Sequence, residues 1–166
     1  MKNNIKYLIM DVDGTLTDGM IYIGNNGEVF KAFNIKDGYG IKNLLSPLGI
    51  TPIIITGRES KILENRCKEL GIVDIYQGIT DKKEILDSIL GTQTKYSQVC
   101  YIGDDLNDLS CMQLIKSYGG LIGCPLDAVS EIKQLADFIS NKNGGNGAVR
   151  EFIDWLINTH WKDVSH

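Results

Sequence analysis

The chain has 166 residues, of which 43% are hydrophobic and 23% are charged, as is typical of one soluble domain with a substantial core. The net charge of −4 and the isoelectric point near 5.1 argue against nucleic acid as a partner, because no basic stripe is available to bind a phosphate backbone. No apolar run approaches a membrane span, the N-terminus lacks a signal pattern and the cysteines lack C-x-x-C spacing, so we expect a cytoplasmic protein, one domain over residues 1–166, with no membrane partner.

Apolar runs and helical patterns alternate along the chain. The expected strands are Ile5–Met10, Thr51–Ile55, Val73–Tyr76, Val99–Ile102 and Tyr118–Ile122. The expected helices are Gly38–Leu45, Glu59–Leu70, Lys82–Leu90, Asp105–Ile115, Ala128–Leu135 and Ala148–Ile157. This alternation predicts an α/β fold, a doubly wound, Rossmann-like parallel sheet covered by helices on both faces.

One stretch, residues 20–34, departs from the alternation. Two short apolar runs flank Gly24-Asn25-Asn26-Gly27, which predicts a β-hairpin with a Gly/Asn turn. Because the hairpin begins soon after the first strand ends, we expect it to stand beside the ligand-binding edge of the sheet as a flap. A purely structural hairpin is the alternative.

The first strand is followed directly by Asp11-Val12-Asp13-Gly14-Thr15. Carboxylates two positions apart on a strand point the same way, and here they lie where open α/β sheets bind ligands. Asp11 can attack phosphorus, while Asp13 can protonate the leaving oxygen and later activate water. Such crowded negative charge calls for a divalent cation, and carboxylates suit Mg²⁺. The alternative is a polar strand end whose aspartates only cap a turn.

Later strand ends carry residues that complement this chemistry. Thr56 and the backbone of Gly57 can bind phosphate oxygens, and Lys82 can neutralise phosphate and nucleophile together. The guanidinium of Arg58 can grip a carboxylate in a bidentate manner, although it could equally form a surface ion pair.

A second acidic cluster follows the strand Val99–Ile102. Within it, Asp104, Asp105 and Asp108 offer the hard oxygen ligands of a metal site, unless they only cap the next helix. The order of these groups along the chain, each at or just beyond a strand end, favours phosphoryl transfer.

With these motifs the chain resembles the haloacid dehalogenase superfamily of phosphatases. The matching residues are Asp11 and Asp13 for its first motif, Thr56 for its second, Lys82 for its third, and Asp104 with Asp105 for its fourth. Segments 33–41, 55–58, 66–72, 76–78 and 144–151 are similar to a small branch of it that acts on sugar-acid phosphates. The resemblance covers nearly the whole chain.

The resemblance implies a Mg²⁺-dependent phosphatase working through an aspartyl phosphate. It places the metal at the Asp11 carboxylate, the backbone carbonyl of Asp13 and Asp104, with Asp105 and Asp108 behind them; Asp105 would orient metal-bound water or Lys82. The implied substrate is a small phosphorylated eight-carbon 2-keto sugar acid of lipopolysaccharide synthesis, and nine-carbon relatives are the alternative.

Substrate contacts are also expected at Asp37, Arg66 and Arg150, which belong to the branch-like segments. Larger members of the superfamily carry a cap domain, but the intervals between the motifs are too short to hold one here. Either a macromolecular substrate or a neighbouring subunit must then cover the site. The resembled branch is homotetrameric, so we expect a homotetramer in which residues 144–166, beginning with a glycine-rich segment, help to close a neighbouring site. A helix that packs only on its own sheet is the alternative.

Two other classes of protein share features of this sequence. A phospho-accepting receiver domain also uses Asp, Thr and Lys on a doubly wound sheet, but Asp13 favours turnover over storage of the phosphoryl group. A catalytically silent oligomerisation domain of the same fold is the other, and the intact motifs argue against it. Because the only histidines are His160 and His166, near the chain end, a histidine-based mechanism is poorly supported.

Overall fold

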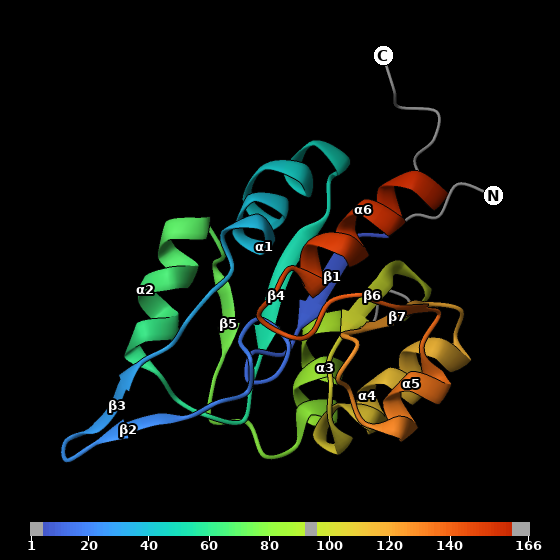
Figure 1. The fold of residues 1–166 in the computed structure, drawn as a ribbon. Coiled ribbons are helices and arrows are strands. Elements are labelled where there is room, and N and C mark those ends of the chain that lie inside the picture. The colour runs from blue at the N-terminus through green and yellow to red at the C-terminus, as the bar shows by residue number, and fades with distance from the viewer. Residues whose placement is uncertain (1–4, 92–95, 161–166) are drawn as a thin grey trace.

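A computed structural model describes residues 5–91 and 96–160. Six parallel strands form one sheet in the order β5-β4-β1-β6-β7-β8 (Figure 1). Their bounds are β1 Tyr7–Met10, β4 Thr51–Ile55, β5 Asp74–Tyr76, β6 Val99–Ile102, β7 Leu121–Cys124 and β8 Phe138–Ile139. The predicted fold class, a doubly wound α/β sheet, is confirmed.

The central strands are buried on both faces, as their nearly continuous apolar sequences require. Met10 at the end of β1 pairs with Ile54 of β4 on one side and with Ile102 of β6 on the other. The residues that follow these three strands therefore emerge side by side at the carboxyl edge of the sheet.

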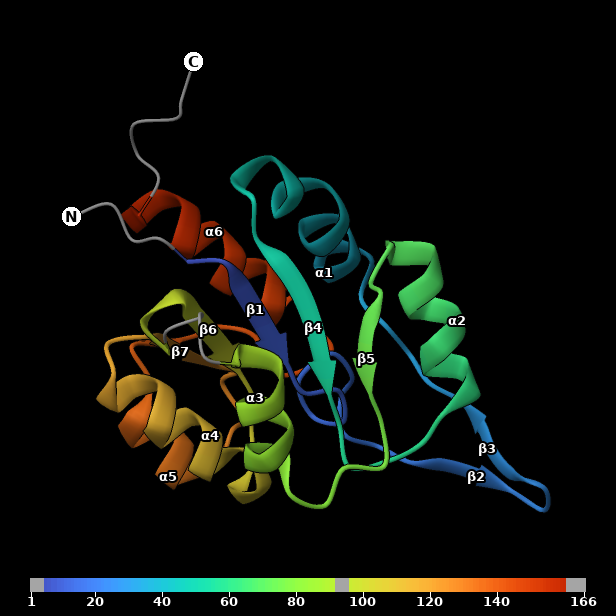
Figure 2. The ribbon, with the colours of Figure 1, turned by 180° about the vertical axis from the view of Figure 1, so that it is seen from behind.

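Helices cover the two faces and enclose two hydrophobic cores (Figures 1 and 2). The first core contains side chains of α2 (Lys61–Leu70), α6 (Ala148–His160) and the π-helix Gly40–Leu44, which continues α1 (Ile35–Tyr39). The second contains side chains of α3 (Lys82–Leu90), α4 (Leu106–Ser117) and α5 (Ser130–Leu135). Short 3-10 turns lie at Ser46–Leu48 and Tyr96–Gln98. None of the helices in the described ranges is long and apolar enough to cross a membrane.

The hairpin consists of β2 (Tyr22–Gly24) and β3 (Gly27–Phe30), which pair antiparallel and form a separate sheet. It projects away from the body of the molecule on the side of α2 (Figure 2). Gly27 makes the turn with a φ of 103°, a conformation that favours glycine.

Several elements differ from the expected ranges by up to three residues at one end, and three differences have a clear physical reason. The helix predicted at Gly38–Leu45 begins earlier, at Ile35, because Asn34 caps it by accepting a hydrogen bond from the backbone of Lys36. The strand predicted at Tyr118–Ile122 is instead β7, Leu121–Cys124, because α4 runs on to Ser117 and a turn follows. The edge strand β8 was not predicted, since two residues carry no recognisable period.

Candidate active site

The candidate site is an open cavity of about 220 Å³ at the carboxyl edge of the sheet. It is lined by Asp11, Asp13, Thr56, Gly57, Arg58, Asp105 and Asn107. These residues come from the segments that follow β1, β4 and β6, as the strand register requires. Strand β1 ends at Met10, so Asp11 and Asp13 lie on the turn beyond it and not on the strand itself. Their carboxylates consequently have different partners.

Asp11 belongs to a buried inner cluster with Lys82, Asp108 and Tyr101. The ammonium of Lys82, at the first residue of α3, donates to Asp11 Oδ1 at 2.8 Å and to Asp108 Oδ1 at 2.7 Å. The Tyr101 hydroxyl also donates to Asp108 Oδ1, at 2.7 Å. Burial by itself would lower the pKa of Lys82, but the charges of Asp108 and Asp11 outweigh it and raise the pKa. Lys82 is therefore a charged group that holds Asp11 in place.

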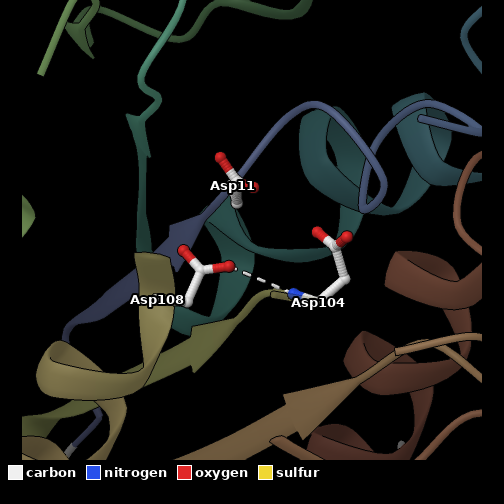
Figure 3. Close-up of side chains that lie close together, drawn as sticks. All are labelled: Asp11, Asp104 and Asp108. Atoms are coloured by element: carbon white, nitrogen blue, oxygen red, sulfur yellow. Dashed lines mark hydrogen bonds between the residues drawn. The ribbon is translucent and has the colours of Figure 1, made fainter. Parts of the chain in front are cut away.

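Three acidic side chains converge beside Lys82. Asp11, Asp104 and Asp108 each offer an oxygen within 4.8 Å of the others (Figure 3). Burial, followed by repulsion from Asp108, raises the pKa of Asp11 to about 6. Burial, followed by repulsion from Asp11, raises the pKa of Asp104 to about 8. Asp11 and Asp104, whose ionisation is disfavoured, form a donor set that a hard divalent cation would stabilise, so these two residues fit Mg²⁺.

The aspartates that follow β6, Asp104, Asp105 and Asp108, have different hydrogen-bond partners. Asp104 Oδ1 accepts a hydrogen bond from the Thr15 hydroxyl at 2.8 Å, which ties the fourth motif to the first. The side chain of Asp105 accepts from the backbone of Leu106 and, with Asp108, forms a capping box at the start of α4. Asp108 is the residue that contacts Lys82. The expectation that Asp105 orients Lys82 is thus not matched by a contact, whereas Asp105 does line the cavity.

Asp13 belongs to an outer cluster with Lys31, Glu28 and Arg58. Lys31 Nζ lies 2.5 Å from Asp13 Oδ1 and 3.0 Å from Glu28 Oε1. Arg58 approaches the same two acids, with its Nε 3.8 Å from Asp13 Oδ2. Sequence reasoning missed Lys31 because a lysine after a hairpin strand looks like a solvated charge. The available signal was the hairpin itself, which returns the chain close to the point where it left the first motif.

The second motif lies where it was expected. Thr56 is buried directly after β4, and its backbone N–H donates to the Tyr76 carbonyl at 2.9 Å. Gly57 and Arg58 continue from it along the cavity wall, and the Arg58 side chain is 45% exposed. Thr56, Gly57 and Arg58 therefore line the same cavity as Asp11 and Asp13.

The three further substrate-binding residues predicted from the branch-like segments do not line this cavity within one chain. The carboxyl of Asp37 is buried and accepts a hydrogen bond from the backbone N–H of Arg150 at 2.8 Å, at the start of α6. Arg66 pairs with Glu69, and Arg150 pairs with Asp154. Their roles in substrate binding stay predictions.

The glycine-rich segment 144–147 packs against the loop of residues 11–18 in its own chain. The backbone N–H of Gly145 donates to the Thr15 carbonyl at 3.1 Å. A Cβ atom at Gly144 would lie 1.8 Å from the Gly14 carbonyl oxygen, so only glycine permits this approach. The apolar side chains of α6 that follow are buried in the first core, as the alternative of a helix on its own sheet requires. Closure of a neighbouring site by this segment stays a prediction.

Several known proteins are similar to this chain over most of its length. The 3-deoxy-D-manno-octulosonate 8-phosphate phosphatase KdsC of Salmonella typhi is 45% identical over 155 residues, which are 93% of this chain and 80% of that protein. The crystal structure of the same phosphatase from Yersinia pestis superposes with a TM-score of 0.87 at 43% identity, covering 97% of this chain and 85% of that one.

A structure from Moraxella catarrhalis, in complex with magnesium, phosphate and KDO, has a TM-score of 0.86 at 38% identity and covers 95% of this chain and 88% of that one. No family model matches the chain. The sheet, the acidic site and these likenesses define a phosphatase of the haloacid dehalogenase superfamily. Within it, the chain belongs to the KdsC family of 3-deoxy-D-manno-octulosonate 8-phosphate phosphatases.

Proposed function

We propose that this phosphatase hydrolyses 3-deoxy-D-manno-octulosonate 8-phosphate through an aspartyl phosphate, with Mg²⁺ as cofactor. The observation that carries the proposal is the buried contact of Asp11 with Lys82 at the open edge of the sheet. This lysine offsets the charge of a carboxylate that must approach an anionic phosphate. The activity for which the relatives are named supplies the identity of the sugar acid.

In the proposed reaction a carboxylate oxygen of Asp11 attacks phosphorus in line, and the bond from phosphorus to the sugar oxygen breaks. Asp13 gives its proton to that oxygen as the sugar acid leaves. Asp13 then takes a proton from water, which attacks the aspartyl phosphate, releases inorganic phosphate and restores Asp11. Thr56 and the Gly57 N–H bind the transferring phosphoryl group, and Lys82 offsets its charge.

The metal would be held by the carboxylates of Asp11 and Asp104 and by the backbone carbonyl of Asp13. Asp108 already contacts Lys82 and Tyr101, and with Asp105 it would stand behind these ligands. When bound, Mg²⁺ supplies positive charge that favours attack by one anion on another. A chelator should therefore abolish turnover and Mg²⁺ should restore it, with Ca²⁺ a poor substitute because its coordination shell is larger and looser. Full activity in excess chelator would remove the metal from the proposal.

Selection of a sugar acid is assigned to Arg58, whose half-exposed guanidinium stands at the cavity beside Asp13. A 2-keto acid carries the carboxylate that such a group binds. The decisive experiment compares kcat/KM of the full-length protein on the eight-carbon 8-phosphate and on nine-carbon 9-phosphates. We expect the eight-carbon acid to be preferred, and a preference for a nine-carbon acid would overturn this assignment. If Mg²⁺ supports no hydrolysis of either acid or of p-nitrophenyl phosphate, the silent oligomerisation domain becomes the better account.

We also propose that the protein is a homotetramer. The apolar side chains of Ile23 and Val29 on the hairpin are 70% and 59% exposed, and association would cover them. Sedimentation equilibrium should give the mass of four chains, and a monomer with full activity would contradict this.

Residues 144–166 are proposed to help close a neighbouring site. Deleting them would damage the fold, because α6 supplies core side chains. Arg150→Ala is the cleaner test of contact with a neighbouring site: it should lower kcat/KM for the sugar-acid phosphate more than for p-nitrophenyl phosphate.

A further inference from the structure

Lys31 is the buried cation of the hairpin. Its side chain is 3% exposed, although it lies one residue beyond a strand whose other side chains mostly face solvent. Removing an ammonium from water is costly unless carboxylates compensate it, and here Asp13 and Glu28 both do so. The contacts of Lys31 thus link the hairpin directly to the proposed acid/base.

Glu28 anchors this contact to the body of the molecule. Its second carboxylate oxygen accepts a hydrogen bond from the Ser60 hydroxyl, and the same hydroxyl accepts one from the backbone N–H of Leu63 as the N-cap of α2. The start of α2 therefore holds Glu28, and Glu28 holds Lys31. Lys31 is consequently held by Glu28 on one side, and its other contact is the carboxyl group of Asp13.

Asp13 needs such a constraint. Its side chain is 20% exposed and stands on a turn, next to Gly14 at a φ of 95°, without the strand pairing that orders Met10. A general acid must keep its carboxyl group within hydrogen-bond reach of the leaving oxygen, so a freely rotating Asp13 would lose much of its effect.

We propose that Lys31 is a positioning residue that holds the Asp13 carboxyl group through Oδ1, so that Oδ2 can carry the proton given to the leaving group. The inference rests on the proposed function, in which Asp13 is the acid/base. Lys31 acts through one oxygen of Asp13 and leaves the other oxygen on the side of Arg58 and the cavity. The hairpin then contributes to the chemistry through Lys31, although none of its residues lines the cavity.

The test compares two substrates of nearly the same shape in the Mg²⁺-loaded full-length protein. Phenolate is a poor leaving group that needs the proton from Asp13, whereas p-nitrophenolate leaves readily without it. We expect Lys31→Met to lower kcat/KM for phenyl phosphate roughly tenfold more than for p-nitrophenyl phosphate, a part of the hundredfold or greater effect of general acid catalysis. Neither substrate carries a carboxylate, so a change in sugar-acid recognition does not affect the ratio of the two kcat/KM values.

A matched control is Lys61→Met, which removes an exposed, ion-paired lysine from the first turn of α2 and should leave the ratio unchanged. If Lys31→Met does not fold, Lys31→Gln is measured instead, because its amide can still donate to Asp13; a smaller shift in the same direction is expected. Equal losses on both substrates, or no loss, would reduce Lys31 to a structural residue. An inactive wild-type protein would instead refute the proposed function, so the two failures are distinguishable.

Discussion

The inner and outer clusters of the site belong to one cavity edge but are built by different means. Asp11, Lys82 and Asp108 are almost completely buried and follow paired strands or begin a helix that packs on the sheet. In the outer cluster, Asp13 and Arg58 are partly exposed, and their partners come from a hairpin outside the main sheet. The inner cluster is thus ordered by the core, whereas the outer cluster is ordered by ion pairs.

This difference suggests a division of labour. Groups that form and break the bond to phosphorus need a fixed geometry, which a packed core supplies. Groups that meet the leaving sugar must admit and release it, which partly exposed side chains allow. Substitutions in the two clusters should therefore have different signatures.

The largest expected effect is at the two aspartates of the first motif. Asp11→Asn and Asp13→Asn should each lower kcat by about a thousandfold or more, because one removes the nucleophile and the other the acid/base. Circular dichroism should show an intact fold in both variants, since Lys82 keeps Asp108 as a partner when Asp11 is neutral. Asp87→Asn, an exposed change of the same kind on α3, serves as the control. Near-native activity of either variant would refute its assigned role.

The next largest effect is expected in the outer cluster, and it should depend on the substrate. Arg58→Ala should reduce kcat/KM for the sugar-acid phosphate by tens to thousands of fold, as expected from a loss of roughly 2–5 kcal/mol for a charge-assisted pair. Activity on p-nitrophenyl phosphate, which has no carboxylate, should change little. Equal losses on the two substrates would make Arg58 a phosphate-binding or structural residue. They would also contradict the proposed difference in role between the inner and outer clusters.

Metal binding should depend on the carboxylate of Asp104 and not on the guanidinium of Arg58. Mg²⁺ at about a hundred times its dissociation constant should stabilise the fold by roughly 2.7 kcal/mol, which thermal unfolding detects as a higher Tm. Asp104→Asn should abolish most of this increase, whereas Arg58→Ala should retain it. A Mg²⁺-induced shift of wild-type size in Asp104→Asn would place the ion elsewhere.

The smallest effect concerns Asp37, a buried carboxyl outside both clusters. Burial raises its pKa from 3.8 to about 6, against the opposing effect of backbone N–H groups near the start of α6. Between these two values the folded chain binds more protons than the unfolded chain, so this group makes the fold less stable as the pH rises through that window. Relative to wild type, Asp37→Asn should therefore gain about 2 kcal/mol of unfolding free energy between pH 4.5 and pH 7.5. Urea unfolding at both pH values measures this, and a constant difference would contradict it.

The sheet and the meeting of the motif residues at its carboxyl edge could be predicted from the sequence for a common reason. Apolar runs that alternate with helices imply parallel strands, and the carboxyl ends of such strands meet, so Asp11, Thr56 and Asp104 were expected together. The pairing of Lys82 with Asp108 instead of Asp105 was not predicted, because the turn at the start of α4 decides which aspartate faces inward.

The contacts of the outer cluster could not be predicted, because they depend on how the hairpin is oriented relative to the sheet. No local sequence pattern encodes that orientation. A hairpin can be recognised from its turn, but its periodicity does not say against which part of the sheet its base will rest, so Lys31 was missed. Likewise, the contact of Asp37 with the start of α6 joins segments far apart in the chain. The assignment of Asp37 to substrate binding came from a resemblance, and this contact offers it a structural role.

The close approach of Gly144 to Gly14 has a consequence for how the enzyme is made. The loop of residues 11–18 is synthesised well before the glycine-rich backbone that packs against it. Contacts of such long sequence separation form late and slowly during folding. A growing chain can thus hold Asp11 and Asp13 long before their loop is supported, and hydrolysis should begin only once α6 has docked.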